Sequence, residues 1–155
     1  MTYELSVRAM RREDLASVGL VLDSTELFPS SMLNEMAEPF LSGNAPHLWL
    51  VAVIEGRAFG FAYCEPERMT EGTYNLLAIA VSTDRQRSGI GAALIRHVEN
   101  DVRERNGLLL LVETSTDLDQ DGAREFYLKD GFTEEARIRD FYAPGQTKVV
   151  FWKKI

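Results

Sequence analysis

Hydrophobic residues either alternate with polar ones or follow one another without a break in several short segments, and both patterns predict β-strands. Glu55-Gly56 is a turn signal that predicts a hairpin between two of these segments. The three segments between positions 48 and 81 are expected to form an antiparallel meander, and the continuous apolar run LLLLVET is typical of a strand buried on both faces. The predicted strands span residues 5–10, 48–54, 57–64, 73–81, 108–114, 132–138 and 148–152.

Apolar residues that recur every three or four positions predict four helices. The clearest spans residues 89–105, where Ile90, Leu94, Val98 and Val102 fall on one face. Pro39 lies inside the second predicted helix and is expected to kink or divide it. The other predicted helices span residues 15–24, 29–43 and 119–130, and the resulting order is β-α-α-β-β-β-α-β-α-β-β.

Composition and charge limit the kind of protein. The chain has 155 residues, 45% of them hydrophobic, with no shift in composition, so we expect one domain over residues 1–155. A formal net charge of −7 argues against a nucleic-acid partner, which requires a basic surface. The longest apolar run, residues 48–54, is far shorter than the roughly 18–20 residues of a membrane span, and the N-terminus lacks the apolar segment of a secretory signal. We therefore expect a cytoplasmic protein without a membrane partner.

Few side chains in the sequence suggest metal or thiol chemistry. His47 and His97 have no partner at the spacing of metal ligands, so a packing or surface role is favoured and no metal is expected. Cys64, the single cysteine, lies in the apolar stretch FGFAYC and is interpreted as a buried structural thiol.

The stretch RQRSGIGAAL connects an apolar strand to the third predicted helix and has the chemistry of an anion site. Free backbone N–H groups and the helix dipole favour a phosphate there, Gly89 and Gly91 allow close approach, and Arg85 and Arg87 could add positive charge. The lysine of a nucleoside-triphosphate loop is missing. Leu94 stands where a dinucleotide-binding loop has its third glycine, so a redox domain is only a runner-up. An ordinary connection with solvated arginines is the simplest alternative.

Two motifs resemble the GCN5-related N-acetyltransferase (GNAT) family. The loop pattern Q/R-x-x-G-x-G/A occurs at residues 86–91, and a second signature occurs downstream as Ala123, Phe126-Tyr127 and Gly131-Phe132. The resemblance implies an α/β (α+β) fold with a mixed, mostly antiparallel sheet of about seven strands and four helices. It also implies an enzyme, monomeric or homodimeric, that transfers acetyl from acetyl-CoA to a small-molecule amine or a peptide without a metal.

The resemblance also implies where acetyl-CoA binds. The backbone N–H groups of Arg87, Gly89, Gly91 and Ala92 would hold its pyrophosphate. The strands at 75–81 and 108–114 would splay so that the pantetheine arm pairs with backbone near Ile79 and Val81. Gln120 replaces an asparagine that often contacts the cofactor in the family. The full predicted set is Ile79, Val81, Gln86, Arg87, Ser88, Gly89, Gly91, Ala92 and Gln120.

Candidate catalytic groups follow from the chemistry of amine acylation. An acceptor amine must lose a proton, and Glu113, a carboxylate near the expected split in the sheet, is the candidate base. Asn75 occupies the position of the base in the histone-modifying branch, but an amide cannot serve as that base. Tyr127 matches the family's general acid, and Phe141 and Tyr142 resemble an aromatic hairpin that lines acceptor sites.

Each of these assignments has a structural alternative. Tyr127, Phe141 and Tyr142 could simply pack in the fold, and Glu113 could be solvated or paired with an arginine. At the level of the whole chain, the alternative is a regulatory or sensor module that binds acyl-CoA without catalysis.

Overall fold

The computed structural model describes residues 4–116 and 121–155. Within these ranges the predicted order of elements is confirmed, with three short 3-10 helices in addition, η1 (Arg12–Asp14), η2 (Ser30–Met32) and η3 (Thr83–Arg85). The main elements are β1 (Leu5–Ala9), α1 (Leu15–Thr25), α2 (Leu33–Leu41), β2 (Leu48–Ile54), β3 (Arg57–Pro66), β4 (Thr73–Val81), α3 (Ile90–Glu104), β5 (Leu109–Ser115), α4 (Asp121–Lys129), β6 (Thr133–Ala143) and β7 (Gln146–Lys154).

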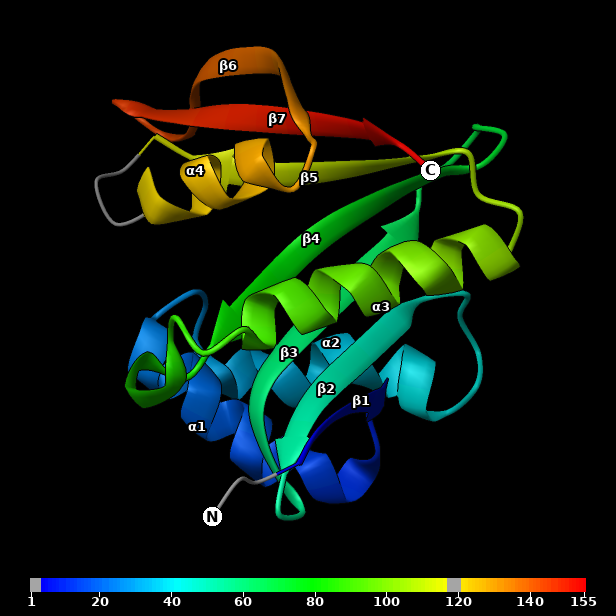
Figure 1. The fold of residues 1–155 in the computed structure, drawn as a ribbon, viewed down its shortest axis with the longest axis vertical. Helices are drawn as coiled ribbons and strands as arrows, with labels where there is room; N and C mark the ends of the chain where they lie inside the picture. Colours follow the sequence, from blue (N-terminus) through cyan, green and yellow to red (C-terminus); the bar gives the residue numbers. More distant parts are fainter. Residues whose placement is uncertain (1–3, 117–120) are drawn as a thin grey trace.

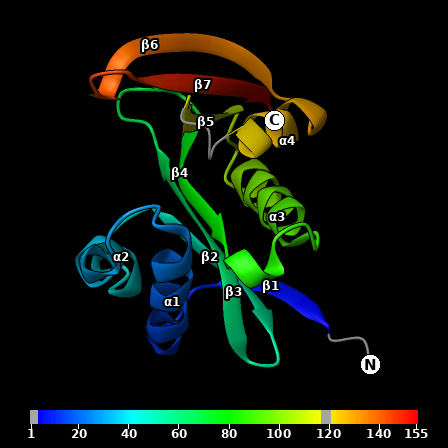
Figure 2. The same ribbon diagram turned by 90° about the vertical axis from the view of Figure 1, so that its left-hand side faces the viewer.

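The described strands form one sheet in the order β1-β2-β3-β4-β5-β7-β6. All neighbours pair antiparallel except β4 and β5, which are parallel, so the expected meander and the mixed sheet are both confirmed. Helices α1 and α2 cover one face, and α3 and α4 cover the other (Figures 1 and 2). Alternate strand residues build two cores, one around Leu94 and Phe151 and one around Val18 and Phe61.

The sheet opens between β4 and β5. These strands pair only from Thr73 opposite Leu109 to Leu76 opposite Val112, and beyond that point they diverge (Figure 1). A bulge lies at the same place, because the partner of β3 shifts from Leu76 to Ala78 and leaves Leu77 without one. A bulge bends its strand and interrupts the ladder, so it contributes to the separation. The splayed strands expected from the resemblance are therefore present.

Helix α3 lies close against β3 beside this opening. A Cβ atom at Gly60 would lie 2.9 Å from Ile90 Cγ2 and 3.2 Å from Leu94 Cδ1, so glycine permits the short separation of helix and strand. Ile90 and Leu94 belong to the first two turns of α3 and are buried. The close packing places the N-terminus of α3 at the end of β4.

The expected burial of the fifth strand on both faces is wrong, and the second helix is not divided. Strand β5 is not buried on both faces: Leu110 and Val112 are buried, whereas Leu111 on the opposite face is only partly covered. The reason is that α1 packs mainly against β3 and β4, and α2 against β2, so these helices leave much of that face of β5 uncovered. Pro39 does not divide α2, since it lies in the last turn, two residues before the helix ends.

The C-terminal hairpin is longer than expected. Strand β6 continues to Ala143 and β7 begins at Gln146, because the pairing resumes after a shift in register between Ile138 and Ala143. Asp140 adopts a left-handed conformation (φ 57°) within this shift, and its Oδ1 accepts a hydrogen bond of 2.8 Å from the N–H of Gly145. This bulged segment contains Phe141 and Tyr142.

An ion pair between Arg8 and the buried Asp14 ties β1 to the start of α1 and gives a prediction about stability. Burial alone would raise the pKa of Asp14, but hydrogen bonds from the Arg8 guanidinium (2.7 and 3.0 Å) and the Arg11 N–H (2.8 Å) outweigh it, and the pKa is lowered. We expect Asp14→Asn to reduce the free energy of unfolding at neutral pH by about 1–3 kcal/mol. A lowered pKa contributes stability above the unfolded-state value of about 3.9 and loses it as pH falls through the folded-state value.

Urea denaturation at neutral pH and at about pH 3 checks this prediction, because the gap between the wild type and Asp14→Asn should narrow in acid. Asp23→Asn is the matched control, since Asp23 is an exposed aspartate near the other end of the same helix. A gap that stays constant with pH would show that the carboxylate charge of Asp14 is not responsible.

Candidate functional site

The loop before α3 presents a row of free backbone donors. Ala93 makes the first helical contact, donating to Gly89 O at 3.0 Å. Over the part of the chain that is described, the N–H groups of Arg87, Gly89, Gly91 and Ala92 have no protein acceptor. Arg87 and Gly89 have positive φ angles of 64° and 86°, which turn the chain into the helix. The helix dipole acts at the same point, so the loop can hold a phosphate or diphosphate.

Side chains of the loop hold it against neighbouring strands. Gln86 Nε2 donates to Val81 O at 3.2 Å, and the Ser88 hydroxyl donates to Arg85 O. The Arg85 guanidinium lies over the ring of Phe59, 4.4 Å from its centroid, so it is directed toward β3. Arg87 is exposed. The geometry therefore attributes the anion site to the backbone, with Gln86 and Ser88 stabilising the loop through their side chains.

Ile79 and Val81 lie on the part of β4 that has left β5. Both are partly buried, and the β5-facing edge of β4 has no strand partner beyond Leu76 in the described ranges. A free strand edge presents backbone N–H and C=O groups that an extended amide-containing chain could pair with. The predicted place for the pantetheine arm is thus available, although Gln86 already engages the carbonyl of Val81.

Tyr127 projects from α4 into the core on the α3 and α4 face. Its side chain is buried, and its ring lies 5.6 Å from that of Phe132 and 5.4 Å from that of Phe151. Burial raises the pKa of Tyr127 above its usual value, so the phenol stays protonated at neutral pH. Tyr127 is therefore both a packing residue and a potential proton donor.

Glu113 lies on the opposite face of β5, beside the point where β4 leaves. Asn75 Nδ2 donates to its Oε1 at 2.9 Å, and Lys148 Nζ contacts the same oxygen at 2.8 Å. Partial burial and the negative charge of Glu113 together raise the pKa of Tyr142. The anticipated arginine partner is absent among the described residues, and a lysine and an amide stand in its place.

Phe141 and Tyr142 are half exposed, and their rings contact each other at 5.1 Å. The Lys148 ammonium lies 4.1 Å from the centroid of Phe141, an attractive cation–aromatic contact. The bulged hairpin thus brings its aromatic side chains to the same face of the sheet as Glu113. The sequence prediction had not included Lys148 or the contact of Asn75 with Glu113.

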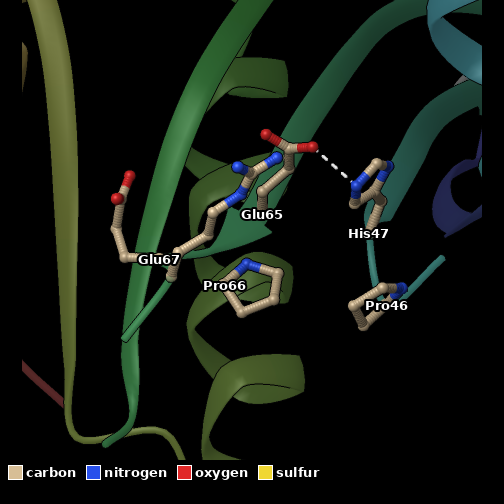
Figure 3. A pocket seen from close by; sticks show the side chains of 6 residues that line it. Pro46, His47, Glu65, Pro66 and Glu67 are labelled. Atoms are coloured by element: carbon tan, nitrogen blue, oxygen red, sulfur yellow. Dashed lines mark ion pairs between the residues drawn. The ribbon is translucent and has the colours of Figure 1, made fainter. Parts of the chain in front are cut away.

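A cavity of about 450 Å³ opens on this face at the end of β3. His47 Nε2 lies 2.6 Å from Glu65 Oε1 on one side of the cavity, and Figure 3 shows the Glu67 side chain directed away from this pair. Glu67 also accepts a hydrogen bond of 3.0 Å from Asn75 Nδ2, so the cavity adjoins the Glu113 network. The lining residues are Pro46, His47, Glu65, Pro66, Glu67 and Arg68.

The remaining predicted residues contribute less. Gln120 lies outside the described residues. Cys64 is fully buried, and burial raises its pKa to about 12, which confirms a structural thiol. No group of three potential metal ligands occurs in the described ranges, and none of the helices there is long and apolar enough to cross a membrane.

The fold and the site together define a class of protein. A seven-stranded mixed sheet with helices on both faces, formed by the described residues, is the fold of GNAT acetyltransferase structures. A model of the acetyltransferase (GNAT) family matches residues 11–132. The chain therefore belongs to the GNAT family of N-acetyltransferases.

Individual relatives agree with this assignment. The chain is 29% identical to an uncharacterized N-acetyltransferase of Methanocaldococcus jannaschii over 112 residues, which cover 70% of this chain and 67% of the relative. It resembles a GNAT-family structure from Desulfovibrio desulfuricans with a TM-score of 0.88 and 32% identity, covering 97% and 99% of the two chains. The structure of yncA from Salmonella typhimurium with acetyl-CoA shares the fold at a TM-score of 0.77 and 14% identity, covering 97% and 93%.

Proposed function

We propose that the protein transfers the acetyl group of acetyl-CoA to a primary amine of a small molecule or peptide, directly and within a ternary complex. The observation that carries this proposal is the placement of Tyr127 and Glu113 on opposite faces of the sheet, beside the opening between β4 and β5. A donor and an acceptor that approach from opposite faces can meet in the opening. We also propose that the chain acts as one domain in the cytoplasm.

The donor side fits acetyl-CoA. The free N–H groups of Arg87, Gly89, Gly91 and Ala92 suit its pyrophosphate, and the unpaired edge of β4 near Ile79 and Val81 suits its amide-containing arm. The yncA structure with acetyl-CoA supports this choice among nucleotide ligands. Acetyl-CoA supplies a thioester, a carbonyl already activated for attack by an amine. Gln120 stays a predicted contact of the donor.

The two candidate catalytic groups have complementary tasks. Glu113 is only about one-fifth exposed and lies beside the opening, where it can accept a proton from the amine. Tyr127 is protonated and can donate a proton to the departing thiolate. Phe141 and Tyr142 offer aromatic surfaces on the Glu113 side, where the acceptor would bind. Glu113 thus takes up the proton that the amine loses, and Tyr127 supplies the proton that the thiolate gains.

Release of free CoA thiol tests the proposal when it is measured over a panel of small amines, amino acids and peptides. We expect at least one compound to give thiol release with acetyl-CoA and a matching acetylated product by mass. Tight binding of acetyl-CoA without thiol release from any member would instead favour the sensor module. A tertiary amine of similar shape is the matched control, because it cannot form a stable amide.

A further inference from the structure

We infer that Asn75 and Lys148 are positioning residues that hold one oxygen of Glu113 and leave the other to accept the proton of the acceptor amine. This inference rests on the proposed function, in which Glu113 is the base. It concerns a polar cluster formed by side chains of β4, β5 and β7 on the α1 and α2 face.

Asn75 is fixed by two carboxylates at once. The residue is 3% exposed, and its side-chain amide nitrogen lies 3.0 Å from Glu67 Oε1 and 2.9 Å from Glu113 Oε1. An amide NH₂ group has two hydrogens, and here each has its own acceptor. Rotating the amide by half a turn would direct its oxygen at two carboxylates, which is unfavourable. The orientation of the Asn75 amide is therefore determined. An asparagine can donate to two acidic neighbours, whereas a third carboxylate at this position would repel them.

Lys148 approaches the same carboxylate from β7. Its side chain is 12% exposed, its Nζ lies 2.8 Å from Glu113 Oε1, and the ring of Phe141 supports the ammonium at 4.1 Å. Lys148 pairs with Ser115 of β5 and Ile138 of β6, so the strand register places it beside Glu113. A lysine confined by a carboxylate, an aromatic ring and two neighbouring strands has little freedom to move.

Both donors act on one oxygen atom. Asn75 Nδ2 donates to Oε1 and Lys148 Nζ lies nearest to the same oxygen, whereas Oε2 of Glu113 accepts no hydrogen bond within residues 4–116 and 121–155. Two fixed contacts on Oε1 restrict rotation of the carboxylate and so set the direction of Oε2. As the amine nitrogen bonds to the acetyl carbon, its proton passes to Oε2, and the thiolate that leaves takes a proton from Tyr127. Misplacing a proton acceptor by about 1 Å can lower a rate about a hundredfold.

A double-mutant cycle separates positioning from a general structural role. Asn75→Ala and Lys148→Met are each made in the wild type and in Glu113→Gln, and kcat is measured with an amine found in the panel. In the wild type each change should lower kcat by about 10- to 100-fold, with the KM for acetyl-CoA unchanged. In Glu113→Gln neither change should lower kcat further, because the base that they position is gone. Equal losses in both backgrounds would overturn the inference.

Two further variants make the experiment decisive. Lys148→Arg keeps the charge and should retain more activity than Lys148→Met, and Lys154→Met removes an exposed lysine from the same strand and should have no effect. Full activity of Lys148→Met or Asn75→Ala would overturn the inference and leave the transferase function intact. Full activity of Glu113→Gln would remove both Glu113 and its positioning residues from the mechanism. Failure of the wild type to acetylate any amine would overturn the proposed function itself.

Discussion

Replacing Tyr127 with phenylalanine is expected to lower kcat by about 10²- to 10⁴-fold, the usual contribution of a positioned acid or base. The phenylalanine ring keeps the contacts with Phe132 and Phe151, so the fold and the binding of acetyl-CoA should be preserved. Only the hydroxyl group is lost, and with it the proton donor for the leaving thiolate. Because burial raises the pKa of Tyr127, its phenol stays protonated near neutral pH, and changes of pH in this range should not alter its role.

The measurement for Tyr127 combines turnover with direct binding. Thiol release gives kcat, and calorimetry gives the dissociation constant of acetyl-CoA, which should stay within about threefold of the wild type. Tyr74→Phe is the matched control, since Tyr74 is also a buried tyrosine in the core on the same face but lies on β4, in the part that still pairs with β5. Undiminished kcat in Tyr127→Phe would remove this residue from proton transfer.

The second large effect is expected at the anion loop. Gly89 has a φ of 86°, a conformation that a β-branched residue adopts only with a strain of about 1–3 kcal/mol, so Gly89→Val should displace the free N–H groups beside it. We expect the dissociation constant of acetyl-CoA to rise by about 10- to 100-fold, equivalent to about 1.4–2.7 kcal/mol. Gly91→Val should also weaken binding, because a side chain on the first turn of α3 would meet the ligand.

Arg87→Ala is the variant with which the effects of the two glycine variants on acetyl-CoA binding are compared. Arg87 is exposed, and an exposed charge is usually worth less than about 1 kcal/mol, so its loss should raise the dissociation constant by only a few-fold. Calorimetric titration of the three variants with acetyl-CoA ranks the effects. A larger loss for Arg87→Ala than for either glycine variant would show that side-chain charge, and not backbone geometry, governs the site.

The periodic elements were the most predictable part of the fold. The four-residue recurrence of Ile90, Leu94, Val98 and Val102 fixes the buried face of α3, and all four side chains are in the core. The opening between β4 and β5 could not be read from periodicity, since strand pairing joins segments far apart in the chain. Only the resemblance to a family indicated it. The length of β6 was also missed: the strand was predicted to end at residue 138, whereas it continues through a bulge to Ala143.

The site was predicted unevenly for a similar reason. The glycine loop was recognisable because its donors are local backbone groups. The neighbours of Glu113 were not recognisable in the sequence, because Asn75 and Lys148 contact it from β4 and β7 only once the sheet has formed. The sequence does place a lysine at the start of the last predicted strand, but nothing local shows which carboxylate it meets. The partners of Glu113 could therefore be identified only once the register of the strands was known.

The central claim is direct transfer of acetyl from acetyl-CoA to an amine, and one isotope experiment tests it most directly. The protein is incubated with deuterium-labelled acetyl-CoA and an amine found in the panel, and the masses of product and intact protein are followed together. We predict that all transferred label appears on the amine while the protein mass stays unchanged throughout. A labelled acetyl group that accumulates on the protein and then passes to the amine would contradict the account.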